Sequence, residues 1–318
     1  MMKQKLYERI LRWKIVRVLI DLSKKLVLPG FDGLPLYTVT VFFIKGLYEG
    51  YITSRASAIS FNFFLAVFPT LIFLFTIIPF IPIEDFQGTL LSLIHDFIPK
   101  SAYETVRETV EDIVTRQRGD LLSLGFILSL YFSTNGLNSL MEAFNNTYHT
   151  IETRSSFRQW LISALLVFIL TVLLILSIGL MTLGPVILSV FIPVKILESA
   201  FYSFLIWLMT WLLSISAFFF AISFLYYLAP ARRRDFRFIS AGSSLATLLV
   251  ILTTAGFNFY VDNFARYNIL YGSIGTLMVV LLWIYFNAIS LLIGFELNAS
   301  IYNAKREKPE IKHEDAPG

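Results

Sequence analysis

The chain contains no cysteine and only three histidines, His95, His149 and His313, among its 318 residues. Disulfides, thiolate metal sites and cysteine nucleophiles are therefore excluded. Three isolated histidines also cannot supply the grouped ligands of a hydrolytic metal site. Charge is scarce as well, because only 15% of the residues are charged, against about 25% in soluble domains. An ordinary water-soluble fold is not expected.

What the chain has instead is apolar mass: 56% of its residues are hydrophobic and its mean hydropathy is +0.70. A helix needs about 20 mostly apolar residues to cross the hydrocarbon core. Six stretches qualify, near residues 57–80, 121–141, 160–191, 201–229, 238–258 and 274–295. They are too long and too uniformly apolar for the alternating strands of a β-barrel. The sequence predicts an all-α, polytopic membrane bundle with six transmembrane helices and additional amphipathic interfacial helices.

The third stretch is longer than a bilayer requires. A straight helix of its 32 residues would extend about 48 Å, whereas the hydrocarbon core is roughly 30 Å thick. We expect this helix to tilt, to protrude, or to break near Gly179, Gly184 and Pro185.

Basic residues are distributed unequally between the two sides of the predicted bundle. Of the 26 lysines and arginines, 20 fall in the segments on one side and 6 on the other. Basic residues accumulate on the cytoplasmic side of membrane proteins. Both termini are therefore predicted to be cytoplasmic, and residues 81–120 to form an extracytoplasmic loop of two short helices separated at Pro99.

The segments outside the spans also have distinct expectations. Residues 1–56 are predicted to hold a basic amphipathic helix, with Leu11, Ile15, Val18, Leu22 and Leu26 on one face, and a short interfacial segment from Leu36 to Ile44. An anionic membrane surface at the cytoplasmic face is the expected partner. Nucleic acid is not, because no aromatic and glycine RNA-binding signature accompanies the charge. Residues 300–318 are predicted to be a disordered cytoplasmic tail, and the sequence leaves the oligomeric state open.

Polar residues within spans are costly in a bilayer, so function is sought there first. The second span has one polar stripe, which we expect to face other helices or a water-filled cavity and never lipid. Its members are Tyr131, Asn135, Asn138, Glu142, Asn145 and His149. The stripe either holds helices together through hydrogen bonds or lines a substrate cavity.

Three other spans carry polar or helix-bending residues. In the first, Arg55 lies two turns below Asn62 on the same face, as an anchor at the interface, and Pro69 is expected to bend the helix. In the last, Asn287 and Asn298 share one face and Glu296 projects opposite, where it would pair with a basic loop residue or bind a cation or proton. The fifth has small and hydroxyl residues typical of close helix packing, namely Ser240, Gly242, Ser244, Thr247, Thr254, Gly256 and Asn258.

Several motifs resemble the YihY/BrkB family of bacterial inner-membrane proteins, formerly labelled ribonuclease BN. The matching residues are Arg55–Ala58, Phe68–Pro69, Asn135–Tyr148, Leu225–Pro230, the cluster Arg232, Arg233 and Arg234, Asn263–Tyr267, Tyr271–Gly272, Leu282–Tyr285 and Gly294–Ala299. The resemblance implies six spans, cytoplasmic termini and an inner-membrane location. The arginine cluster is first a topology signal and second an anionic-lipid site.

The residues favour transport over catalysis. The chain has neither a glycine-rich phosphate loop nor a G-x-S-x-G elbow, so we expect no enzyme, no cofactor and no metal site, and a ribonuclease is disfavoured. The polar stripes favour a transporter or flippase-like translocator of a lipid or amphipathic solute. Its candidate cavity-lining residues are Asn62, Tyr131, Asn135, Asn138, Glu142, Asn287, Glu296 and Asn298. The alternative is a non-catalytic membrane scaffold or envelope-assembly factor, in which the stripes only hold helices together.

Overall fold

The computed structural model describes residues 14–80, 116–147, 150–151, 155–191, 200–231, 237–264 and 273–307. These ranges are almost entirely helical, as predicted. The helices are α2 (Lys14–Lys25), α3 (Leu36–Glu49), α4 (Ile52–Ile77) with the 3₁₀ turn η1 (Ile78–Phe80), α7 (Gly119–Asn145), α8 (Ser156–Phe191), α10 (Ala200–Leu228), α11 (Ala241–Phe264) and α13 (Ser273–Glu307). A two-residue antiparallel pair, β1 (Asn146–Thr147) and β2 (Thr150–Ile151), follows α7.

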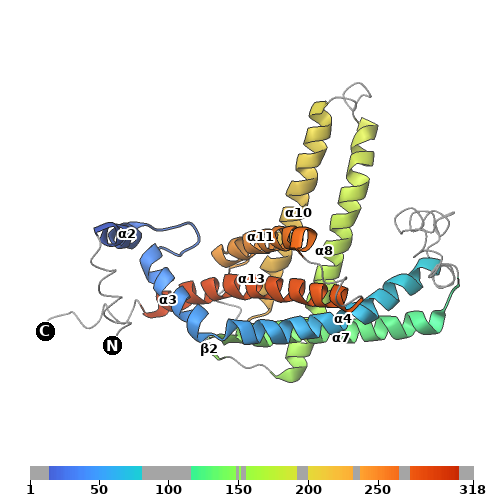
Figure 1. Cartoon of the computed structure of the whole chain (residues 1–318), viewed down its shortest axis with the longest axis horizontal. Coiled ribbons are helices and arrows are strands. Elements are labelled where there is room, and N and C mark those ends of the chain that lie inside the picture. The colour runs from blue at the N-terminus through green and yellow to red at the C-terminus, as the bar shows by residue number, and fades with distance from the viewer. Residues whose placement is uncertain are drawn as a thin grey trace.

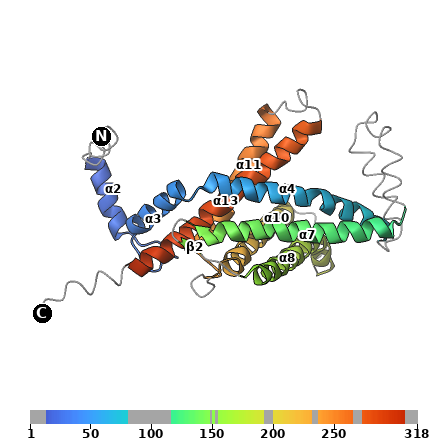
Figure 2. The ribbon, with the colours of Figure 1, turned by 90° about the horizontal axis from the view of Figure 1, so that it is seen from below.

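The long helices form three antiparallel pairs that meet at one end and diverge toward the other (Figures 1 and 2). The pairs are α4 with α7, α8 with α10, and α11 with α13. The most extensive contacts between the pairs are those of α4 with α13, α7 with α8, and α10 with α11. We call the shared end the base; it contains the first halves of α4, α8 and α11 and the second halves of α7, α10 and α13. The opposite ends are the tips.

Five helices in the described ranges are long and apolar enough to cross a membrane: α4 with η1, α8, α10, α11 and α13. The second predicted span, α7, is 27 residues long, but its asparagines and serines lower its hydropathy. It nevertheless lies alongside α4 (Figures 1 and 2). The long helices therefore match the six predicted stretches in order, five of them as candidate spans.

The N-terminal segment packs on the last helix. Phe31, Leu34 and Val39 are buried against Leu297 and Ile301 near the end of α13. The two ends of the described chain therefore lie together at the base.

Two boundaries differ from the sequence-based expectations. The disordered tail predicted from residue 300 is wrong for residues 300–307, because α13 continues to Glu307 and buries Ile301 and Ala304 against α3. The third span does not break near Gly184 and Pro185, since α8 is one helix of 36 residues. The loop predicted at 81–120 lies mostly outside the described residues.

Pro69 and the turn between α3 and α4 shape the start of the bundle. Pro69 lies buried inside α4, whose second half inclines away from the first, the bend expected of a proline within a helix (Figure 1). Between α3 and α4, Tyr51 has a φ of 48°, in the left-handed region, which ends one helix and lets the next start in a new direction.

An ion cluster fastens the N-terminal segment to the base. Asp32, in the turn before α3, forms two ion pairs. Its Oδ1 atom lies 3.0 Å from Arg237 Nη2, and its Oδ2 atom lies 3.1 Å from Lys305 Nζ. Arg237 precedes α11 and Lys305 lies in the last turn of α13, so one carboxylate connects three segments far apart in the chain.

Candidate functional site

Buried side chains concentrate at the base. The largest fully buried ones include Ile59, Leu140, Met141, Phe144, Leu166, Tyr226, Leu292, Phe295 and Glu296. Apolar residues are exposed on the outer faces of the helices at both ends, and at the tips they include Leu74 and Phe75 on α4, Leu124 and Ile127 on α7, Ile175 on α8, and Trp207 and Trp211 on α10. The described helices thus share a buried core at the base and diverge toward the tips, while their outer faces present hydrocarbon-compatible surface.

The base contains a buried ion pair between Arg55 of α4 and Glu296 of α13. Arg55 Nη1 lies 3.9 Å from Glu296 Oε2, and the two side chains are 11% and 0% exposed. The guanidinium also donates to the carbonyl of Gly50 at 2.9 Å and to that of Ala143, at the end of α7. Arg55 therefore connects α4, α7 and α13, and it is not an anchor reaching out to the interface.

A glycine of α3 makes room for this carboxylate. At Gly46, a Cβ atom would lie 2.7 Å from Glu296 Cδ and would overlap its Oε1 atom. The backbone of α3, the helix that precedes α4, thus packs directly on the carboxylate of the ion pair. Sequence reasoning missed Gly46, because a lone glycine in a short helix carries no sign of the side chain that packs against it.

Three aromatic rings lie next to the ion pair on α7, α10 and α13. Phe144 stacks on Phe295 with ring centroids 4.2 Å apart, and the Tyr226 ring meets both edge-on. The Tyr226 hydroxyl donates to the carbonyl of Leu291. Aromatic stacking and this hydrogen bond therefore hold α7, α10 and α13 together at the base.

The helices α11 and α13 cross at two glycines. A Cβ atom on Gly294 would lie 2.6 Å from the carbonyl oxygen of Gly242 and 2.7 Å from the Tyr226 hydroxyl. Beside this crossing, Asn298 accepts from the Gly242 amide at 2.8 Å and donates to Ser240 Oγ at 2.9 Å. Asn298 therefore binds a backbone amide in the first turn of α11, which has no partner within its own helix.

Alanine substitutions at two glycines should have opposite effects. Gly294→Ala places its methyl group against backbone, which cannot move aside, and should lower the free energy of unfolding by about 1–3 kcal/mol. Gly256→Ala on α11 meets nothing within 4 Å and should be neutral or stabilise by up to about 1 kcal/mol, because alanine favours the helix. Thermal unfolding in detergent would measure both; equal effects would contradict the close crossing.

Most of the predicted cavity-lining residues bond to neighbouring helices. Asn62 donates to Ser139 of α7 at 2.7 Å. Asn138 accepts a hydrogen bond from Ser163 of α8 at 3.3 Å, and Glu142 accepts one from Gln159 of α8 at 3.4 Å. These contacts are the ones expected if the polar stripe holds helices together.

The remaining candidates lie farther from the base contacts. Tyr131 is 56% exposed, so no neighbouring helix covers it within the described residues. Asn135 is half-buried, and Asn287 donates to the carbonyl of Trp283 on its own helix and accepts from Thr254 of α11 at 3.5 Å. His149, the cluster Arg232, Arg233 and Arg234, and the pair Tyr271 and Gly272 lie outside the described residues.

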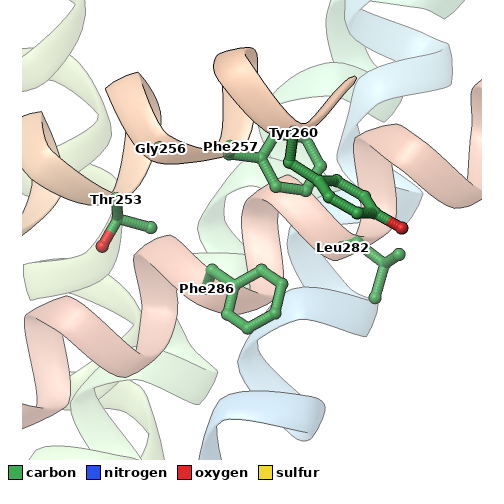
Figure 3. A pocket seen from close by; sticks show the side chains of 6 residues that line it. All are labelled: Thr253, Gly256, Phe257, Tyr260, Leu282 and Phe286. Carbon is green, nitrogen blue, oxygen red and sulfur yellow. The ribbon is translucent and has the colours of Figure 1, made fainter. Parts of the chain in front are cut away.

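A separate pocket of about 400 Å³ lies between α11 and α13, toward their tips (Figure 3). Its lining is apolar apart from two hydroxyl groups and consists of Thr253, Gly256, Phe257, Tyr260, Leu282 and Phe286. None of these belongs to the predicted site. Sequence reasoning assigned Gly256 to close helix packing, but this glycine faces open space, whereas Gly242 does pack closely.

Comparisons with known proteins place this architecture among membrane proteins. A family model described as virulence factor BrkB matches residues 43–318. The chain is 30% identical to the putative ribonuclease-like protein YfkH of Bacillus subtilis (strain 168), over 83% of this chain and 96% of that protein. It is 23% identical to a UPF0761 membrane protein of Aggregatibacter aphrophilus (strain NJ8700), over 85% and 94%. No solved structure matches it.

Proposed function

Because the chain belongs to the virulence factor BrkB family, we propose that this multi-pass membrane protein moves a lipid or another amphipathic solute across the bacterial cytoplasmic membrane. The observation that carries the proposal is the asymmetry of packing. Side chains close the base, while the tips diverge and expose apolar residues. A protein closed at one end and open at the other has the form expected of one state in alternating access.

The second state would require the base to open. The contact between α7 and α8 is the place where this can happen at low cost, because polar pairs, Asn138 with Ser163 and Glu142 with Gln159, contribute to it. Such bonds are replaced by water when helices separate. In the proposal, the α8/α10 pair moves away from the α4/α7 pair, which also separates the Tyr226 ring from Phe144, and α4 and α7 stay together as one unit.

The orientation in the proposal has the base facing the cytoplasm. It follows from the excess of basic residues on that side. Helix α2 then lies at the cytoplasmic surface, where its exposed Val18 and Leu22 can enter the interface and Lys24 and Lys25 can meet anionic headgroups. Anionic lipids are accordingly the proposed partners of α2.

The scaffold alternative has its own supporting observation, which is the interhelical bonding of Asn62, Asn138 and Asn298. In that case the polar residues stabilise a static bundle and no solute passes. The two functions differ in one measurable property, which is the transfer of lipid between leaflets by the purified protein.

The proposal is tested by reconstituting the full chain into vesicles of phosphatidylethanolamine and phosphatidylglycerol with a fluorescent phospholipid. A membrane-impermeant quencher acts only on the outer leaflet. In vesicles with protein it should quench nearly all of the fluorescence, because labelled lipids from the inner leaflet are transferred to the outer one. In vesicles without protein it should quench only the fluorophores that were in the outer leaflet from the start. Transfer equal to that of empty vesicles, for several headgroups and with or without a pH gradient, would favour the scaffold function.

A further inference from the structure

The pocket between α11 and α13 is lined at one helical position by a residue without a side chain. A Cβ atom on Gly256 would meet nothing within 4 Å, so a larger side chain at this position has room to extend into the pocket. Around it, Phe257 contacts Tyr260 and Phe286 with ring centroids 6.5 Å and 6.2 Å apart. Figure 3 shows these rings and Leu282 gathered around one side of Gly256.

The chemistry of this pocket suits hydrocarbon and not water. Thr253 turns its methyl group toward the other lining residues and its hydroxyl away from them (Figure 3). That hydroxyl already shares a hydrogen bond with Ser290 Oγ at 3.0 Å. A water molecule needs two to four polar partners, which such a lining does not provide. A volume of about 400 Å³ lies within the range of ligand pockets.

The pocket is oriented along a membrane span. Both helices are candidate spans, and Tyr260 lies at the end of the α11 span, Ala241–Val261, while Thr253 lies near its middle. Seven residues of helix separate these positions, about 10 Å along the axis. The Tyr260 hydroxyl points to one end of the pocket (Figure 3). Tyrosine is favoured at the membrane interface, so the pocket extends from headgroup depth toward the bilayer centre.

We propose that this pocket binds one acyl chain of a phospholipid from the leaflet adjacent to Tyr260. The chain lies against Phe257 and Phe286, and its glycerol end is at the level of the Tyr260 hydroxyl. The surrounding face of α11 exposes Leu252 and Phe259, so bilayer hydrocarbon is the medium that reaches the opening. The site does not depend on the proposed translocation, because a scaffold could hold a structural lipid in the same way.

The test uses a phosphatidylethanolamine with a photoreactive diazirine in its acyl chain, reconstituted with the full chain in nanodiscs. Gly256→Leu fills the pocket and should reduce labelling of peptides containing residues 253–260 and 282–286 at least fivefold. Gly179→Leu is the matched control, because Gly179 also lies in a span and faces open space, on α8. This variant should be labelled on α11 and α13 as strongly as the unmodified protein.

Each possible result decides the matter. Labelling that both leucine variants retain would overturn the proposal, as would labelling spread evenly over the exposed faces of α8 and α10. Labelling by a diazirine fatty acid but not by the phospholipid would also overturn it. Thermal unfolding confirms that Gly256→Leu is folded, and the leaflet-transfer assay on the same sample distinguishes loss of the site from absence of transport.

Discussion

An Arg55→Met variant is expected to lose about 3–5 kcal/mol of unfolding free energy, the cost of removing one partner from a buried ion pair. Glu296 is fully buried and its carboxylate is 3.9 Å from the Arg55 guanidinium. Without Arg55, this carboxylate stays in a medium of low dielectric without its countercharge. The carbonyls of Gly50 and Ala143 lose their donor as well.

Two further variants separate charge from packing. Arg55→Met/Glu296→Met removes both charges and should recover most of the loss, since an apolar pair of similar size often replaces a buried ion pair without cost. Lys305→Met removes a partner of Asp32 that is 59% exposed and should cost less than about 1 kcal/mol. If the Arg55 and Lys305 variants unfold at the same temperature in detergent, the ion pair does not hold the base together.

The helices were predictable because each apolar stretch has about the 20 residues or more that a membrane-spanning helix needs. The pairing of Glu296 was not. The sequence favours a basic loop residue, a cation or a proton, whereas the structure gives it Arg55 from the first span. Periodicity along one helix identifies a face, but it contains no information about which distant helix covers that face. Gly46, which packs on the same carboxylate, was missed for the same reason.

Glycine shows the same limit within a single helix. Gly242 and Gly256 both lie on α11, and sequence alone assigns both to close packing. Gly242 meets the backbone of Gly294, whereas Gly256 lines the apolar pocket. The difference arises within the α11/α13 pair, because the two helices cross closely near the base and leave a pocket between them toward their tips. No local sequence pattern records how far apart two helices lie.

Lipid transfer in the proposed mechanism requires α7 and α8 to separate at the base, and a chain without cysteine allows this separation to be blocked by an engineered disulfide. Asn138→Cys/Ser163→Cys replaces side chains whose polar atoms are 3.3 Å apart on α7 and α8, so a disulfide would join two helix pairs. Asn62→Cys/Ser139→Cys makes the same exchange at 2.7 Å between α4 and α7, within one pair.

The measurement is leaflet transfer of a fluorescent phospholipid by each double variant, before and after oxidation and again after reduction. We predict that oxidation stops transfer by Asn138→Cys/Ser163→Cys, that reduction restores it, and that Asn62→Cys/Ser139→Cys transfers lipid at the same rate in both states. Undiminished transfer with the disulfide between α7 and α8 fully formed would rule out this mechanism, because the base would then have no need to open.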